Sequence, residues 1–107
     1  MNKLEINNNK TFEDIKHVDE NGVEYWLARE LQSVLDYKEW RKFENVINKS
    51  KLACENSNIS IFEHFVDIDK LSKRANNAEV VINDYKLSRY ACYLLEKEKQ
   101  KKLKKTD

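Results

Sequence analysis

The strongest structural signal in the chain is a helical repeat of apolar residues between positions 40 and 54. Apolar or small side chains recur there at intervals of three and four residues: Trp40, Phe43, Ile47, Ser50 and Cys54. Because an α-helix has about 3.6 residues per turn, this spacing places all five on one face. We therefore expect a helix over residues 37–54 with this face in the core. Asp36 is its expected N-cap, since Glu39 follows three residues later.

A shorter amphipathic helix is expected immediately before this one, over residues 28–35. Leu27, Leu31 and Val34 follow the same helical period. Two helices joined so closely form a pair similar to a helix–turn–helix. Such a pair can present the outer face of its second helix to a partner.

Extended segments on both sides of this helix pair predict a small antiparallel sheet. Residues 15–18 and 23–27 flank an Asn-Gly step, which readily forms a tight hairpin turn. One helical turn starting at Thr11 is expected before this hairpin. Residues 65–71 and 80–87 are the other expected strands, because β-branched and aromatic side chains are frequent in them.

The connections in the second half of the chain also carry local signals. Ser60 can begin a single helical turn, and residues 74–78 have the composition of a turn. Asn83-Asp84 is expected to mark a bulge or bend in the last strand. Ser88 is the expected N-cap of the final helix. The aromatic residues expected in the core are Trp26, Trp40, Phe43 and Tyr90.

The chain has 107 residues, which suffices for one small domain. The mixture of short helices and strands predicts an α+β fold with a small antiparallel sheet. We expect residues 1–10 to be a disordered leader, residues 11–96 the domain, and residues 97–107 a lysine-rich tail. There is no long apolar run, no signal sequence and no disulfide framework, so we expect a cytoplasmic protein without a membrane segment.

The ionisable residues do not indicate an enzyme. Zinc sites usually contain a closely spaced pair of ligands, and none is formed by the soft ligands near the middle of the chain, Cys54, His64 and Cys92. We expect no metal and no cofactor. The enzymatic alternative is a Mg²⁺-dependent nuclease with Asp67, Asp84 and Lys86 on neighbouring strands. A solvated strand face explains the same residues, and we expect no catalytic activity.

The outer face of the expected 37–54 helix carries side chains that suit nucleic acid. Arginine and asparagine reach guanine and adenine edges, and lysine neutralises phosphate. Arg41, Asn45 and Asn48 are spaced so that one groove could contact all three. The candidate binding residues of this face are Lys38, Arg41, Lys42, Asn45, Asn48 and Lys49. An ordinary solvated helix face is the alternative.

The charge distribution leaves two classes of partner open. The net charge is +1, but residues 37–51 have a balance of +3, residues 52–69 of −4 and residues 97–107 of +4. The basic segments favour nucleic acid, and the tail could add salt-sensitive affinity. The acidic segment favours a protein partner.

Several longer blocks resemble a known family. They lie at residues 25–31, 39–43, 53–57 and 84–94, and include Ala-Cys-Glu-Asn-Ser and Leu-Ser-Arg-Tyr-Ala-Cys-Tyr-Leu. In order and spacing they resemble the BRO family N-terminal domain, found in phage antirepressors, large DNA viruses and bacterial proteins induced by DNA damage. The resemblance implies an α+β DNA-binding module without known enzymatic activity, in SOS-response proteins that modulate recombination and repair. It adds Arg89 and Arg29 as candidate contacts, and either could instead be a buried ion-pair partner.

The chain departs from the family pattern at two places. Where relatives commonly have Leu-Gly-Tyr, it has Leu35-Asp36-Tyr37, which puts a carboxylate at the bend. After Glu96 it turns into lysines, where relatives continue into further segments. DNA is the expected partner, with a recombinase or repressor protein and self-association also possible. The alternative function is a protein–protein interaction module without direct DNA contact.

Overall fold

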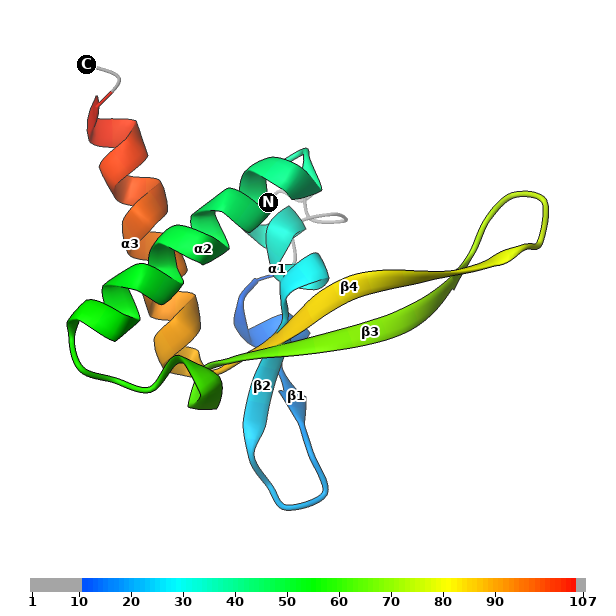
Figure 1. Ribbon diagram of the computed structural model, residues 1–107, viewed down its shortest axis with the longest axis horizontal. Helices are drawn as coiled ribbons and strands as arrows, with labels where there is room; N and C mark the ends of the chain where they lie inside the picture. The colour runs from blue at the N-terminus through cyan, green and yellow to red at the C-terminus, as the bar shows by residue number, and fades with distance from the viewer. Residues whose placement is uncertain (1–10, 106–107) are drawn as a thin grey trace, which may run out of the picture.

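A computed structural model describes residues 11–105 of the chain, with side chains for residues 11–101. The expected leader, residues 1–10, lies outside this part. The described part is an α+β domain, as predicted, with one antiparallel sheet in the order β1-β2-β4-β3 (Figure 1). The elements in chain order are a 3-10 turn (Glu13–Ile15), β1 (His17–Val18), β2 (Glu24–Leu27), α1 (Ala28–Val34), α2 (Trp40–Asn56), a second 3-10 turn (Ile61–Glu63), β3 (Phe65–Lys73), β4 (Glu79–Leu87) and α3 (Arg89–Lys105).

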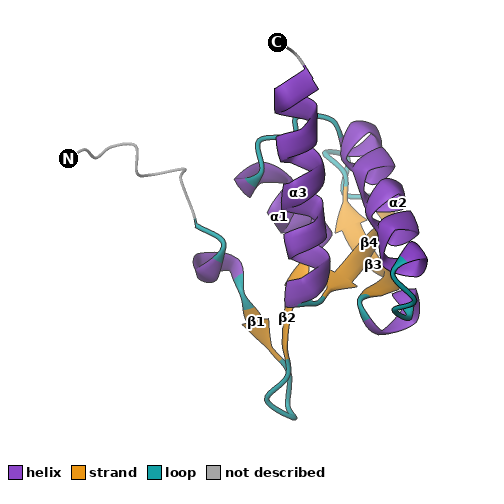
Figure 2. Cartoon of the chain, turned by 90° about the vertical axis from the view of Figure 1, so that its left-hand side faces the viewer, coloured by secondary structure: helices purple, strands orange, loops and turns teal. Residues whose placement is uncertain are grey.

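The helices gather at one end of the sheet, and the β3–β4 hairpin extends away from them as a long two-stranded arm (Figure 1). Helices α2 and α3 pack side by side against the base of the sheet (Figure 2). No helix in the part that the structure describes is long and apolar enough to span a membrane.

The first hairpin forms as predicted, with β1 and β2 antiparallel. The Asp19 carboxylate organises its turn by accepting hydrogen bonds from the N–H groups of Asn21 and Val23, at 2.8 and 2.9 Å. Gly22 closes the turn with a φ of +81°, a conformation that glycine adopts without steric cost. The helical turn expected before the hairpin is the short 3-10 turn at Glu13–Ile15.

The connection between α1 and α2 corrects one prediction. Asp36 does not cap α2, which begins four residues later at Trp40 without a side-chain cap. Asp36 instead ends α1: its φ is +64°, its N–H donates to Ser33 O, and the N–H of Tyr37 donates to Gln32 O. This is the Schellman arrangement, in which the residue with positive φ is usually glycine. A residue with a side chain therefore stands at a position whose backbone geometry favours glycine.

The core is built where the helical repeats predicted it. Trp26, Phe43, Ile47 and Leu95 are fully buried. Trp26 stacks on Phe12, with ring centroids 4.3 Å apart, and its indole Nε1–H donates to Phe12 O at 2.9 Å. Each such aromatic removes about 150–250 Å² from water, so these side chains contribute much of the hydrophobic stabilisation.

Two of the aromatic residues expected in the core lie at its margin. Trp40 and Tyr90 are partly buried and pack against the core from outside. The Trp40 ring contacts Phe43 on one side, and the guanidinium of Arg29 lies over it at 3.8 Å from the centroid. Because α2 begins at Trp40, no preceding helical turn covers this ring, and a cation takes that place.

The β3–β4 ladder is continuous, which corrects a second prediction. Nine consecutive pairs run from Phe65↔Leu87 to Lys73↔Glu79, so Asn83 and Asp84 form no bulge. Two polar residues in the middle of a strand, Asn83 and Asp84, suggested an interruption of the ladder. Asp84 is instead fully buried, and its carboxylate accepts a hydrogen bond from the backbone of α1.

Helix α3 begins as the sequence predicted. The Ser88 hydroxyl accepts a hydrogen bond from the N–H of Ala91 at 3.0 Å, which is the N-cap interaction. The His64 Nδ1 lies 2.6 Å from the same hydroxyl. The helix continues beyond Glu96 to Lys105, so lysines expected in a tail stand on its last turns.

Candidate nucleic-acid interface

The outer face of α2 is the one predicted from the sequence. Arg41, Lys42, Asn45, Asn48 and Lys49 are all exposed, and Lys38 is exposed in the connection just before the helix. Lys38 therefore flanks this face without belonging to the helix.

The opposite side of α2 fixes how this face is presented. Phe43, Ile47, Ser50 and Cys54 are buried, so rotation of the helix about its axis would expose core side chains. With 17 residues at about 1.5 Å per residue, α2 is long enough to lie along a DNA groove. Arg41, Asn45 and Asn48 thus face solvent along one line.

The cations of this face have few partners within the molecule. Among the described residues, no hydrogen bond or salt bridge engages the side chains of Lys38, Arg41 or Lys49. Lys42 has only a loose contact with Glu39, 3.9 Å long, between two largely exposed side chains. Exposed pairs of this kind contribute at most about 1 kcal/mol. These charges are available to an external anion.

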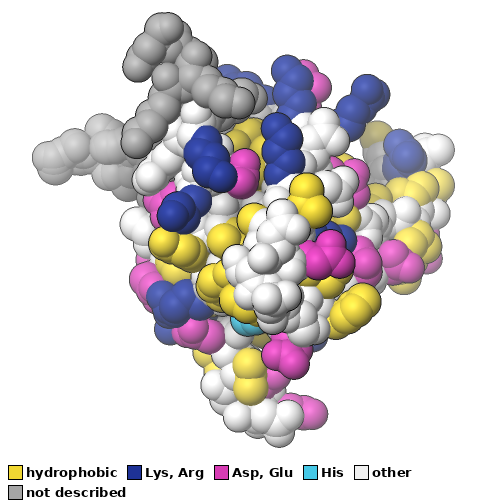
Figure 3. All heavy atoms as spheres, turned by 60° about the vertical axis from the view of Figure 1, so that its left-hand side comes forward, with side chains coloured by type: hydrophobic (Ala, Val, Ile, Leu, Met, Phe, Trp, Pro, Cys, Tyr) yellow, Lys and Arg dark blue, Asp and Glu magenta, His cyan; other side chains and the backbone are white. Residues whose placement is uncertain are grey.

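Further basic residues lie near the start of α2. Lys99 of α3 donates a hydrogen bond to Leu35 O in the α1–α2 connection, which places this part of α3 beside the residues that lead into α2. In the view of Figure 3, lysine and arginine side chains gather in the upper half, at the height of the end of α3 and the start of α2. Acidic side chains are more frequent below them.

Arg29 is held inside the fold and does not join this face. Its Nε–H donates to Asn83 O at 2.9 Å, and its guanidinium stacks on Trp40. It therefore links α1, β4 and the first residue of α2. The sequence offered a buried ion pair as the alternative role of Arg29. Its contacts favour such a structural role, but its partners are a backbone carbonyl and an aromatic ring and not a carboxylate.

Arg89, the other arginine added by the family resemblance, is paired with two carboxylates. Its Nε and Nη2 groups donate to the two oxygens of Glu24 at 2.7 and 2.9 Å, and Nη1 donates to Glu13 at 3.2 Å. The hydrogen bond from Arg89 holds the pKa of the Glu24 carboxyl below its ordinary value. The same bond raises the pKa of Arg89. Its charge is thus neutralised locally, and it ties α3 to β2.

The carboxylates considered for a nuclease do not converge. Ile68 is the cross-strand partner of Asp84, so Asp84 lies on the face of the ladder opposite to Asp67 and Asp69. The Asp84 Oδ2 atom is 2.9 Å from Lys70 Nζ. No cluster of three or more metal-ligating side chains occurs among the described residues. The Asp67–Asp84–Lys86 site of the nuclease alternative is therefore not formed.

The two cysteines are buried free thiols. Burial raises the pKa of Cys54, and it raises the pKa of Cys92 to about 12. Both thiols are therefore protonated at neutral pH, in the state that packs as a small apolar group.

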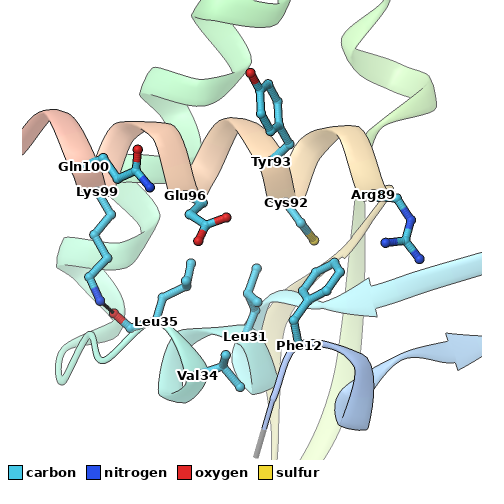
Figure 4. A pocket seen from close by; sticks show the side chains of 10 residues that line it. All are labelled: Phe12, Leu31, Val34, Leu35, Arg89, Cys92, Tyr93, Glu96, Lys99 and Gln100. Carbon is cyan, nitrogen blue, oxygen red and sulfur yellow. Dashed lines mark hydrogen bonds between the residues drawn. The ribbon is translucent and has the colours of Figure 1, made fainter.

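An open groove lies between α1 and the first turns of α3, with a volume of about 580 Å³. Figure 4 shows Cys92 and Glu96 pointing from α3 toward Leu31 and Leu35, and Lys99 reaching across to the α1 side. Sequence reasoning did not find this groove. The signal was present in the spacing of the α3 side chains that line it, Arg89, Cys92, Tyr93, Glu96, Lys99 and Gln100.

Comparison with known proteins decides the family. The BRO family N-terminal domain matches residues 14–106. The chain belongs to this family. This chain is also 46% identical over 84 residues to DNA damage-inducible protein D of Escherichia coli strain K12. That match covers 78% of this chain and 31% of the relative, so the chain spans less than a third of that protein. No solved structure matches this chain.

The family assignment confirms the resemblance seen in the sequence. The specific blocks occupy the sheet and helix contacts of the BRO domain: residues 84–94 span the end of β4, the Ser88 cap and the first turns of α3. The block at residues 84–94 therefore encodes part of the fold. The block at residues 39–43 includes Arg41 and Lys42 of the outer face of α2, and the other residues of that face lie outside the blocks.

Proposed function

We propose that this BRO domain is a non-enzymatic DNA-binding module of a regulatory protein in the DNA-damage response or in phage regulation. The observation that carries the proposal is the outer face of α2, where cations with few internal partners lie beside two asparagines on one exposed side of the helix. The similarity to a DNA damage-inducible protein supports the biological setting. A role in modulating recombination or repair rests on this similarity.

The mode of binding follows from the residue types. Lys38, Lys42 and Lys49 would neutralise phosphates, a contact that gives salt-dependent affinity and little sequence preference. Arg41 and the asparagines would reach base edges in the major groove. We do not include Arg89, because Glu24 and Glu13 already hold its guanidinium.

The test is binding of labelled duplex and single-stranded DNA at two salt concentrations. Arg41→Ala with Lys42→Ala should weaken binding at both and reduce its salt dependence. The control is Lys16→Ala with Lys86→Ala, which removes two cations that already contact Glu13 and the Tyr25 ring. Equal affinity of the α2 variant and the wild type would remove this face from the proposal.

A second candidate is docking to a protein partner, such as a recombinase or a repressor. The α1–α3 groove favours it, because Phe12, Leu31, Val34 and Leu35 form an apolar wall beside charged rims. Val34→Asp should abolish binding to a recombinase filament if the groove is the docking site. Loss of filament binding in the α2 variant instead would assign the contact to DNA in the filament.

A further inference from the structure

The β3–β4 arm is the most prominent feature that the α2 surface does not explain. Beyond Val66↔Lys86 the ladder has no third strand, because β2 pairs with only two residues of β4, Lys86 and Leu87. Among the described residues, the outermost hydrogen bonds between the arm and the helices are those of Asn83 and Asp84 with Arg29. Four rungs and a turn lie farther out, a projection of about 13 Å at 3.3 Å per residue, without the turn.

The backbone polar groups at the tip of the arm are hydrogen-bonded to one another, and the tip carries the exposed cations Lys73 and Arg74. Arg74 N–H donates to Ala78 O at 2.9 Å, Asn77 N–H donates to Arg74 O at 2.8 Å, and the Asn76 Oδ1 accepts from Ala78 N–H at 3.1 Å. The tip backbone is thus held by its own hydrogen bonds. No acidic residue occurs from position 70 to position 78.

Lys73 and Arg74 are exposed, and no hydrogen bond or salt bridge within the described residues engages either side chain. Glu79 is the cross-strand neighbour of Lys73, but no salt bridge joins the two. Lys70, in contrast, is held by Asp84 at the root. The available positive charge is therefore concentrated at the end of the arm.

The root of the arm is fixed to the start of α2. The Tyr85 hydroxyl donates to Glu44 at 3.1 Å, and the Tyr85 and Trp40 rings lie 6.2 Å apart. Burial raises the pKa of Tyr85 to about 12, so the hydroxyl keeps its proton at neutral pH. Arg29 adds its stacking on Trp40. The direction of the arm is thus set relative to the outer face of α2.

We propose that the β3–β4 arm is a second duplex-binding element, in which Lys73 and Arg74 bind DNA phosphates while α2 contacts the groove. The inference rests on the proposed function. A two-stranded ribbon has the width that a major groove admits, and such ribbons also enter minor grooves. The exposed cross-strand pair Leu71 and Val81 gives the ribbon an apolar face that can pack on the groove wall.

The test is fluorescence anisotropy of the full chain with a labelled duplex over a series of salt concentrations. Lys73→Ala with Arg74→Ala should reduce the steepness of the negative slope of log K against log salt by about 2, because each phosphate contact contributes about −0.9. Lys73→Arg with Arg74→Lys should keep the wild-type slope. The matched charge control, Lys16→Ala with Lys86→Ala, should also keep it.

The outcomes separate the arm from the α2 face. If the arm variant keeps the wild-type slope while Arg41→Ala with Lys42→Ala lowers it, the arm inference is wrong and the proposed function stands. If the wild-type chain binds neither duplex nor single-stranded DNA even at low salt, both fail, whereas binding of single-stranded DNA alone overturns only the duplex-binding arm. Since the arm residues are exposed, thermal unfolding of each variant should match the wild type.

The competing occupant of the arm is a second copy of the chain. In that case the wild type would be a dimer in sedimentation equilibrium, and Leu71→Ser with Val81→Ser would make it a monomer. Lys73→Ala with Arg74→Ala, the tip variant, would leave DNA binding unchanged. That pair of results would overturn the inference. A monomeric wild type whose tip variant loses salt dependence supports it.

Discussion

The carboxylate of Asp84 accepts a hydrogen bond from the backbone N–H of Arg29, 55 positions earlier in the chain, at 3.0 Å. Arg29 stands in the first turn of α1, a helix whose own N-cap, Leu27, provides no side-chain cap. A residue of β4 therefore caps a helix formed by a distant segment. The same carboxylate also accepts from Tyr85 N–H and pairs with Lys70.

Replacing Asp84 should therefore destabilise the fold. Asp84→Ala leaves the α1 N–H and the partly buried Lys70 without their acceptor, and we expect a loss of about 3 kcal/mol in the free energy of unfolding. Urea denaturation measures it. The exposed Asp67→Ala should stay within about 0.5 kcal/mol of the wild type. Equal stability of the two variants would show that Asp84 has no capping role.

Asp36 offers the opposite change, a gain in stability. With a φ of +64°, the backbone of Asp36 is in the left-handed region. This conformation costs a residue with a Cβ about 1–2 kcal/mol, and aspartate somewhat less. Asp36→Gly should raise the free energy of unfolding by about 1 kcal/mol, measured by thermal denaturation. Asp36→Ala removes the same charge but keeps a Cβ, so it should bring no such gain. A gain in both variants would point to the charge as the cause.

Trp40 should contribute less to stability than its neighbour Phe43. Phe43 is fully buried, so Phe43→Ala should cost about 3–5 kcal/mol. Trp40 is only partly buried. Trp40→Ala removes its contacts at the edge of the core and the stacking of Arg29, and should lower the free energy of unfolding by about 2 kcal/mol. Chemical denaturation of both variants tests the order. A larger loss for Trp40→Ala would place this ring in the centre of the core.

Helical periodicity predicted the middle of α2 correctly, because the buried positions Phe43, Ile47, Ser50 and Cys54 repeat with the period of the helix itself. The predicted start of the helix at residue 37 was wrong, because Asp36 ends α1 and does not cap α2. Sequence spacing cannot distinguish a cap before one helix from a left-handed residue after another. The exposed face of α2 was predictable for the same reason as its buried face.

Long-range contacts account for what the sequence did not indicate. The polar Asp84 within a strand sequence favoured an interruption of that strand. Its carboxylate finds a hydrogen-bond donor only because α1, a distant segment, packs next to β4. The sequence left open whether Arg89 contacts an external partner or forms an ion pair, and only the fold brings Glu24 to it. The projection of the arm depends on where β2 stops pairing with β4, which no local pattern encodes.

The ion pair of Glu24 and Arg89 predicts a pH dependence of stability. The pKa of Glu24 is lowered in the folded state, mainly by its hydrogen bond from Arg89, from an ordinary value of 4.5. The unfolded chain therefore binds more protons in the range just below that value, and stability falls there with decreasing pH. The contribution is present at neutral pH and disappears as the pH falls through the lowered pKa.

Glu24→Gln should thus lower the melting temperature at pH 7, and this deficit should shrink as the pH falls through the lowered pKa of Glu24, because the wild-type carboxyl then also becomes protonated. Melting curves of both proteins across this range measure the difference. Glu39→Gln is the matched control, because Glu39 has only the loose contact with Lys42 and should change little at any pH. A Glu24→Gln deficit that stays constant from pH 7 through the whole acid range would mean that packing, and not the charge of this pair, joins α3 to β2.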